Sequence, residues 1–168
     1  MATLNKTYVS PPGGKTAPTG ASKTSSNAAL TPVKIERILS ASSTDPRHPP
    51  ENIIDMADPK SFWISTGLYP QFVTLELARP VVVRKLMVTS TGVAQFVVEQ
   101  QDHAADNQSK LLPEFTVIGS SRAQNSDQLQ TTTISIQNAE QKPTRVVKLV
   151  LKKGFQEYSS LRKILVSE

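Results

Sequence analysis

The sequence predicts an all-β fold, an antiparallel sandwich or barrel, on three observations. From Pro32 onward the chain consists of about seven short runs rich in β-forming residues, separated by clusters of turn residues. Apolar residues in these runs recur with a period of two, which is the spacing that places one face of a strand in a core. Almost no segment shows the longer period of an amphipathic helix, so a helical layer is not expected.

The most clearly predicted strand covers residues 71–78, in which Val73, Leu75 and Leu77 share one face. Residues 145–152 alternate between apolar and polar side chains in the same way. Because a period of two marks a half-buried strand, both segments are expected to contribute one face to the core. Further strands are expected at residues 81–90, after a turn at Arg79 and Pro80, and at residues 95–100, 114–120, 131–137 and 161–167.

The segments outside these strands are expected to form a helical turn, a loop and an N-terminal tail. Residues 49–55 are expected to form one helical turn, because proline is favoured in the first turn of a helix. The polar residues 102–110 are expected to form a loop. Residues 1–31 are mostly Ser, Thr, Pro, Gly, Ala and Asn, which cannot bury enough apolar surface to offset chain entropy. The sequence therefore predicts a disordered tail over residues 1–31, dispensable for folding, and one domain over residues 32–168.

The composition excludes several classes of protein. The chain has 168 residues, a one-domain length, and 38% of them are hydrophobic, which is enough for a core. No apolar run approaches the roughly 18 to 20 residues that span a bilayer. The first residues lack the apolar segment of a secretory signal, so we expect a soluble intracellular protein. Cysteine is absent, which excludes disulfides, thiolate zinc sites and cysteine nucleophiles.

The charge gives little support for binding to nucleic acid. The formal net charge is +5, and Lys6, Lys15 and Lys23 of the tail account for 3 of these charges, which leaves +2 for the domain. A nucleic-acid interface needs clustered Lys and Arg. The basic residues that come nearest to a cluster are Lys148, Lys152, Lys153, Arg162 and Lys163. We interpret them as a solvated strand face, and the alternative is a functional basic patch.

Catalytic motifs are missing from the sequence. His48 and His103 are the two histidines, and their spacing is not that of a metal-ligand pair. The sequence has no glycine-rich phosphate loop, no nucleophile elbow and no HExxH motif. We therefore expect a protein that binds a partner and is not an enzyme.

A cation site is one interpretation of the segment around residue 55. Asn52, Asp55, Asp58 and Ser61 place four oxygen-bearing side chains within ten positions. Hard cations such as calcium take six to eight oxygen ligands from carboxylates, hydroxyls and backbone carbonyls. The alternative is a plain turn, because Asp and Asn hydrogen-bond their own backbone and Pro59 fixes one dihedral angle.

The same segment carries a family resemblance. Asn52, Asp55 and Trp63 have the spacing that is the signature of the galactose-binding-like jelly-roll domains, and residues 33–168 resemble that family. The resemblance implies an antiparallel jelly-roll β-sandwich. Because a fold name is not an activity, it does not imply that this chain binds galactose.

Within that fold the chain resembles one family of intraflagellar transport subunits more closely. The residues that carry this resemblance are HPPENIID at 48–55 and FW-x-x-TG-x-x-PQ at 62–71, with a weaker similarity at 154–160. The resemblance implies a non-enzymatic subunit of intraflagellar transport complex B, located in the cilium or flagellum and the cytoplasm. It also implies a heterodimer with a Rab-like small GTPase, the intraflagellar transport protein twenty-seven, and no binding to nucleic acid or insertion into membranes.

The resemblance also implies a structural calcium ion at this turn. By position, Asp55 supplies a carboxylate, Ser61 a hydroxyl, and Asn52 and Asp58 backbone carbonyls, while Glu168 at the end of the last strand closes the site. The family commonly has Asp-Gly-Asn/Asp-Pro at the turn. This chain has one residue more and lacks the glycine, since it reads Asp-Met-Ala-Asp-Pro at residues 55–59.

Other functions remain open at this point. Jelly rolls of this type include ligand-binding modules for glycans or lipid head groups, which usually carry a secretory signal, and substrate-recognition subunits of ubiquitin ligases. In sugar-binding modules, exposed aromatic residues stack on the ligand. Trp63 lies between Phe62 and Ile64 beside the turn and is therefore expected to belong to the core.

Overall fold

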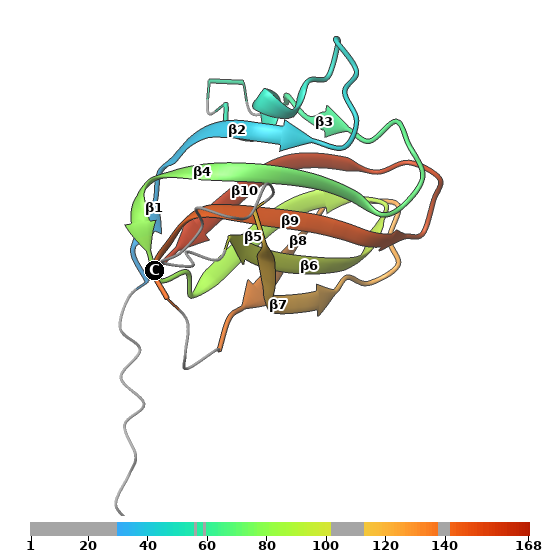
Figure 1. Cartoon of the computed structure of the whole chain (residues 1–168). Helices are drawn as coiled ribbons and strands as arrows, with labels where there is room; N and C mark the ends of the chain where they lie inside the picture. The colour runs from blue at the N-terminus through green and yellow to red at the C-terminus, as the bar shows by residue number, and fades with distance from the viewer. Residues whose placement is uncertain (1–29, 56, 59, 102–112, 138–141) are drawn as a thin grey trace, which may run out of the picture.

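The computed structural model describes residues 30–55, 57–58, 60–101, 113–137 and 142–168. In these residues, two antiparallel sheets pack face to face, which confirms the predicted all-β jelly-roll sandwich (Figure 1). The predicted loop at 102–110 and residues 1–29 of the predicted tail lie outside the described residues. Thr31 and Glu168 exchange two backbone hydrogen bonds, so the folded domain includes Thr31. None of the helical structure in the described ranges has the length and hydropathy needed to cross a bilayer.

The first sheet has the strand order β1-β10-β5-β8, with β3 paired to β10 beside this path. Its strands are β1 (Pro32–Val33), β3 (Trp63–Ile64), β5 (Lys85–Thr91), β8 (Gln130–Ser135) and β10 (Ser160–Ser167). The second sheet has the order β2-β4-β9-β6-β7. Its strands are β2 (Ile35–Ala41), β4 (Gln71–Val81), β6 (Val93–Gln101), β7 (Phe115–Arg122) and β9 (Thr144–Gly154). One short 3₁₀ helix, η1 (Pro50–Ile53), forms where a helical turn was predicted.

The core lies between the two sheets and follows the predicted alternation. Val73, Leu75 and Leu77 of β4 are fully buried, and the adjacent β9 buries Leu149 and Leu151 beside them. Trp63 and Phe96 are the largest fully buried side chains among the described residues. These apolar faces account for the stability of the sandwich, because burial of apolar surface is the main favourable term in folding.

The prediction of a turn at Arg79 and Pro80 is wrong. Both residues belong to β4, which runs to Val81, and β5 begins only at Lys85. The register between β4 and β9 is interrupted between Glu76 and Val81. Proline has no N–H to donate to a sheet, so Pro80 is tolerated in the strand at this interruption.

Strand β2 was not predicted, and its register explains why. Its inward-facing residues are Ile35, Ile38 and Ala41, which are spaced by three positions and not by two. The pairing of β2 with β4 shifts twice, between Ile35 and Arg37 and between Ile38 and Ser40. Each such irregularity moves the following side chains to the other face, so the strand has no period of two.

Gly154, at the end of β9, is packed against the ring of Tyr69. A Cβ atom at residue 154 would overlap two ring carbons of Tyr69 and its hydroxyl oxygen. We expect Gly154→Ala to lower the free energy of unfolding by about 1 to 3 kcal/mol, the usual cost of overpacking. Thermal unfolding of Gly154→Ala, Tyr69→Ala and the double variant measures this, and the cost of Gly154→Ala should largely disappear when Tyr69 is already alanine. Equal costs in both backgrounds would show that the overlap is not the cause.

Candidate metal site

The predicted calcium ligands lie on the turn between η1 and β3. Ser61 Oγ is 3.1 Å from the carbonyl oxygen of Asn52 and 2.7 Å from that of Asp58. The Asn52 side chain donates a hydrogen bond of 2.9 Å to the carbonyl of Phe62, which ties η1 to the chain entering β3. Three of the predicted ligand oxygens therefore converge, namely one hydroxyl and two backbone carbonyls.

The two acidic side chains stabilise the turn itself. One carboxylate oxygen of Asp55 accepts a hydrogen bond of 2.8 Å from the N–H of Ala57. Asp58 accepts one of the same length from the N–H of Lys60. These are the local contacts of a plain Asp turn. Because an ionised carboxylate offers about four lone-pair directions, such contacts are compatible with a cation at the other oxygen.

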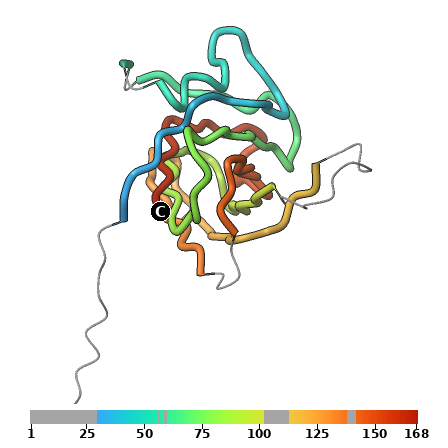
Figure 2. Tube along the Cα trace, turned by 60° about the vertical axis from the view of Figure 1, so that its left-hand side comes forward, coloured from blue at the N-terminus to red at the C-terminus, as the bar shows by residue number. Residues whose placement is uncertain are grey.

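Glu168 does not join this group. The Arg79 guanidinium donates to both of its carboxylate oxygens, one at 3.0 Å, and the carboxylate raises the pKa of Arg79. Trp63 pairs with Leu161 at the start of β10, and Glu168 follows the other end of that strand. Ile54, next to Asp55, lines a hollow with Leu165, and at about 3.3 Å per residue the three residues from Leu165 to Glu168 correspond to about 10 Å along the strand. Figures 1 and 2 show the C-terminus well away from the turn.

The remaining ligands give a weak fit for calcium. Within the described ranges, no group of three or more His, Asp or Glu side chains is arranged to hold a metal ion. Asp55 is therefore the single charged ligand of the predicted set, because Asn52 and Asp58 would bind through carbonyls and Ser61 through its hydroxyl. These oxygen donors are of the type that calcium prefers, but a single carboxylate neutralises only part of the charge of a divalent ion.

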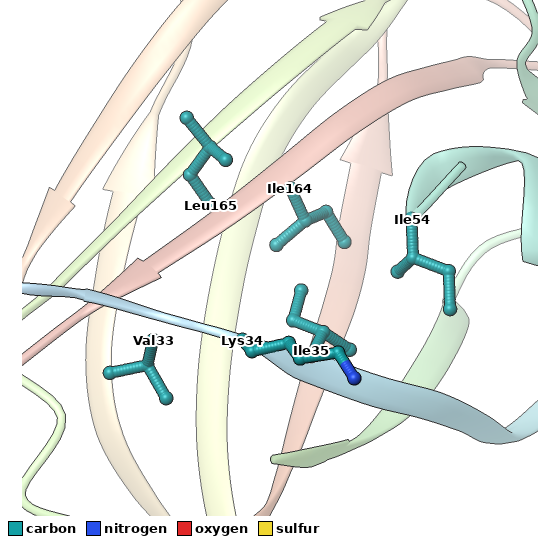
Figure 3. A pocket seen from close by; sticks show the side chains of 6 residues that line it. All are labelled: Val33, Lys34, Ile35, Ile54, Ile164 and Leu165. Atoms are coloured by element: carbon teal, nitrogen blue, oxygen red, sulfur yellow. The ribbon is translucent and has the colours of Figure 1, made fainter. Parts of the chain in front are cut away.

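Packing connects the turn to the last strand. Ile53 of η1 is buried, and Ile54 lines an apolar hollow of about 220 Å³ between η1, β10 and the start of β2. Figure 3 shows the six residues that line this hollow: Val33, Lys34, Ile35, Ile54, Ile164 and Leu165. Asp55 follows Ile54 directly, so this contact helps position the carboxylate relative to β10.

Trp63 belongs to the core, as predicted. Its side chain is fully buried, and its indole Nε1 donates a hydrogen bond of 3.0 Å to the carbonyl of Ser43. His48 stacks on Phe62, with the ring centroids 4.1 Å apart. His48, Phe62 and Trp63 thus hold the loop of residues 42–48 and the turn against the sandwich.

The predicted basic cluster is divided between the two sheets. Lys148, Lys152 and Lys153 lie on β9 in the second sheet, whereas Arg162 and Lys163 lie on β10 in the first. Lys148 is also paired with Glu99 at 3.4 Å. These residues therefore form no common patch, and the interpretation as strand faces is the better one.

Comparisons with known proteins agree with this architecture. Residues 30–157 match the family model described as the XRCC1 N terminal domain. The solved XRCC1 N-terminal domain is 18% identical, with a TM-score of 0.66 over 82% of this chain and 99% of that chain. The family 32 CBM from C. perfringens NanJ, solved in complex with galactose, is 15% identical, with a TM-score of 0.63 over 83% of this chain and 99% of that one.

The curated relatives that match this chain are all named Intraflagellar transport protein 25 or its homolog. Intraflagellar transport protein 25 of Chlamydomonas reinhardtii is 30% identical over 129 residues, which are 77% of this chain and 63% of that protein. The Mus musculus homolog is 38% identical over 63 residues, which are 38% of this chain and 43% of that protein. The chain thus spans less than two thirds of the length of these relatives.

Proposed function

The chain belongs to the XRCC1 N terminal domain family, and from this premise we propose that it is a non-enzymatic binding subunit of the intraflagellar transport machinery. The observation that carries the proposal is the 30% identity to Intraflagellar transport protein 25 over 77% of the chain. The sandwich supports it, since two rigid sheets offer broad outer faces of the kind that protein interfaces use. The expected location is the cilium or flagellum, and the cytoplasm from which subunits are supplied.

The proposal extends to the partner. We propose that the chain forms a heterodimer with a Rab-like small GTPase, the intraflagellar transport protein twenty-seven, and through it joins complex B. This step depends on the sequence resemblance carried by residues 48–55 and 62–71.

The test is affinity purification of the tagged full chain from ciliated cells, with identification of the proteins that accompany it. We expect a Rab-like GTPase at a stoichiometry near one, together with other transport subunits. A purification that yields the intact chain without any transport subunit would contradict the proposal.

A glycan- or lipid-binding module is the rival function. Its support is the similarity to sugar-binding domains such as the galactose-bound CBM, which at 15% identity concerns the fold alone. The two functions separate in the same purification, because a glycan module would not bring down transport subunits.

We also propose that the turn over residues 52–61 binds calcium through Asp55, Ser61 and the carbonyls of Asn52 and Asp58. Convergence of the last three oxygens supports the proposal. Glu168 is omitted from the ligand set because Arg79 holds its carboxylate at the other end of β10. The ion would be structural: it would stiffen the turn that leads into Trp63.

A further inference from the structure

The outer face of the second sheet differs from that of the first. The core-facing residues of β4 and β9 alternate with a second set that faces away from the core, including the half-buried Phe72 and Lys148. Register places Phe72 beside Val150, and Val150 beside Val97 of β6. In the first sheet the outward residues include Thr89 and Thr131, and the strands of that sheet hold no aromatic residue except the buried Trp63. The second sheet alone thus offers aromatic rings on its outer face within the described strands.

A hollow of about 320 Å³ lies in this face, and we call it the Lys148 hollow. It is lined by Leu39, Ser40, Phe72, Thr74, Gln101, Pro113, Phe115, Val146 and Lys148. The Lys148 ammonium is 4.7 Å from the ring centroid of Phe72 and 5.1 Å from that of Phe115. Both rings thereby hold a cation in place at the centre of an apolar surface.

The charges around the hollow present positive groups to solvent. Arg37 and Arg145 both pair with Glu76, whose side chain is only 15% exposed, whereas the two arginines are 67% and 49% exposed. Lys148 pairs with Glu99. Three cations therefore share two carboxylates, and the Glu76 carboxylate is less exposed than either arginine that it pairs with.

The size of the hollow limits what it can accept. Pockets for small ligands measure about 300 to 1,000 Å³, so this one is at the small end and suits a single anchoring side chain. Interface energy is concentrated in such anchors, which fill a central pocket and are ringed by weaker polar contacts. Exposed cations around an apolar pocket are complementary to an anchor with acidic neighbours.

We propose that the Lys148 hollow is a docking site for an acidic segment of a protein partner, which packs one apolar side chain against the Phe72 ring, beside the Lys148 ammonium. The carboxylates of the segment pair with Arg37, Arg145 and Lys148. The inference rests on the proposed function, in that a binding subunit needs such a surface, and it names the chemistry of the partner.

The first experiment maps binding on the isotopically labelled full chain by NMR. The probe is the synthetic peptide acetyl-Glu-Asp-Glu-Leu-Trp-Glu-Asp-Glu-amide. Two control peptides have Gln and Asn in place of its acids, or Ser in place of its Leu and Trp. We expect the amides around Phe72, Phe115 and Lys148 to shift with the first peptide only, and less at high salt.

Substitutions test whether Lys148 and Arg145 are responsible for binding of the acidic peptide. We expect Lys148→Glu and the milder Arg145→Gln to weaken peptide binding, the first at least tenfold, while Lys163→Glu on the first sheet leaves it unchanged. Shifts that map elsewhere, equal binding of the uncharged peptide, or no shift at millimolar peptide would overturn the proposal. Dimerisation of the chain in sedimentation runs that Lys148→Glu abolishes would instead assign the hollow to a second copy.

Purification from ciliated cells separates this inference from the proposed function. If the wild-type chain and Lys163→Glu bring down transport subunits and Lys148→Glu does not, the hollow is the docking site. If all three bring them down equally, the proposed function stands and the docking site is wrong. If the wild-type chain brings down none, the proposed function fails, whereas the peptide measurement still decides the chemistry of the hollow.

Discussion

Replacement of Trp63 with alanine is expected to lower the free energy of unfolding by about 3 to 5 kcal/mol, the usual range for a large buried aromatic residue. The indole is fully buried and its strand pairs with Leu161 of β10. The substitution also removes the donor to the Ser43 carbonyl, which holds the loop of residues 42–48. Chemical denaturation of the purified chain measures the loss.

Two further variants separate packing from other causes. Trp63→Phe keeps much of the volume and loses the hydrogen bond, so about 1 kcal/mol of the loss should come from that bond. Phe155→Ala serves as the matched aromatic control, because Phe155 is exposed and its loss should change stability by no more than about 0.5 kcal/mol. A Trp63→Ala protein of unchanged stability that had lost partner binding would show that the side chain acts at a surface.

The sequence predicts those strands in which apolar residues alternate over several positions, even where their pairing contains a register shift. Residues 71–78 and 145–152 lie side by side as β4 and β9, and their inward faces are the predicted ones. Strand β2 escapes prediction because two register shifts remove its period, and β3 because two residues are too few to show one. Pattern reasoning thus recovers the alternating strands, including the edge strands β7 and β8, and misses β1, β2 and β3.

Proximity along the chain decides which site residues can be predicted. Asn52, Asp58 and Ser61 lie within ten positions, and the turn brings their oxygens together. Glu168 was placed by resemblance alone, and the direction of β10 carries it away. The Lys148 hollow could not be predicted, because register alone brings Phe72, Lys148 and Phe115 together from three strands.

Calcium is expected to raise the melting temperature of the chain, and a chelator to lower it. A ligand that binds only the folded state stabilises it by about 2.7 kcal/mol at a hundredfold excess over Kd. Asp55 is the single full carboxylate in the proposed set, so Asp55→Ala should abolish the response to both additions. Ser61→Ala should weaken the response, because it removes the hydroxyl that lies 2.7 Å from the Asp58 carbonyl.

Glu168→Gln is the control that distinguishes this ligand set from one closed by the last strand. The Glu168 carboxylate is paired with Arg79, so its loss should alter the stability of the chain equally with and without calcium. The calcium-dependent part of the melting shift should therefore persist in this variant. If Glu168→Gln abolished that shift, the last strand would have to reach the turn, contrary to the pairing seen here. Identical melting curves of the wild-type chain in calcium and in chelator, with no bound metal by elemental analysis, would leave Asp55 and Asp58 as the backbone caps of a plain turn, because their contacts to Ala57 and Lys60 require no ion.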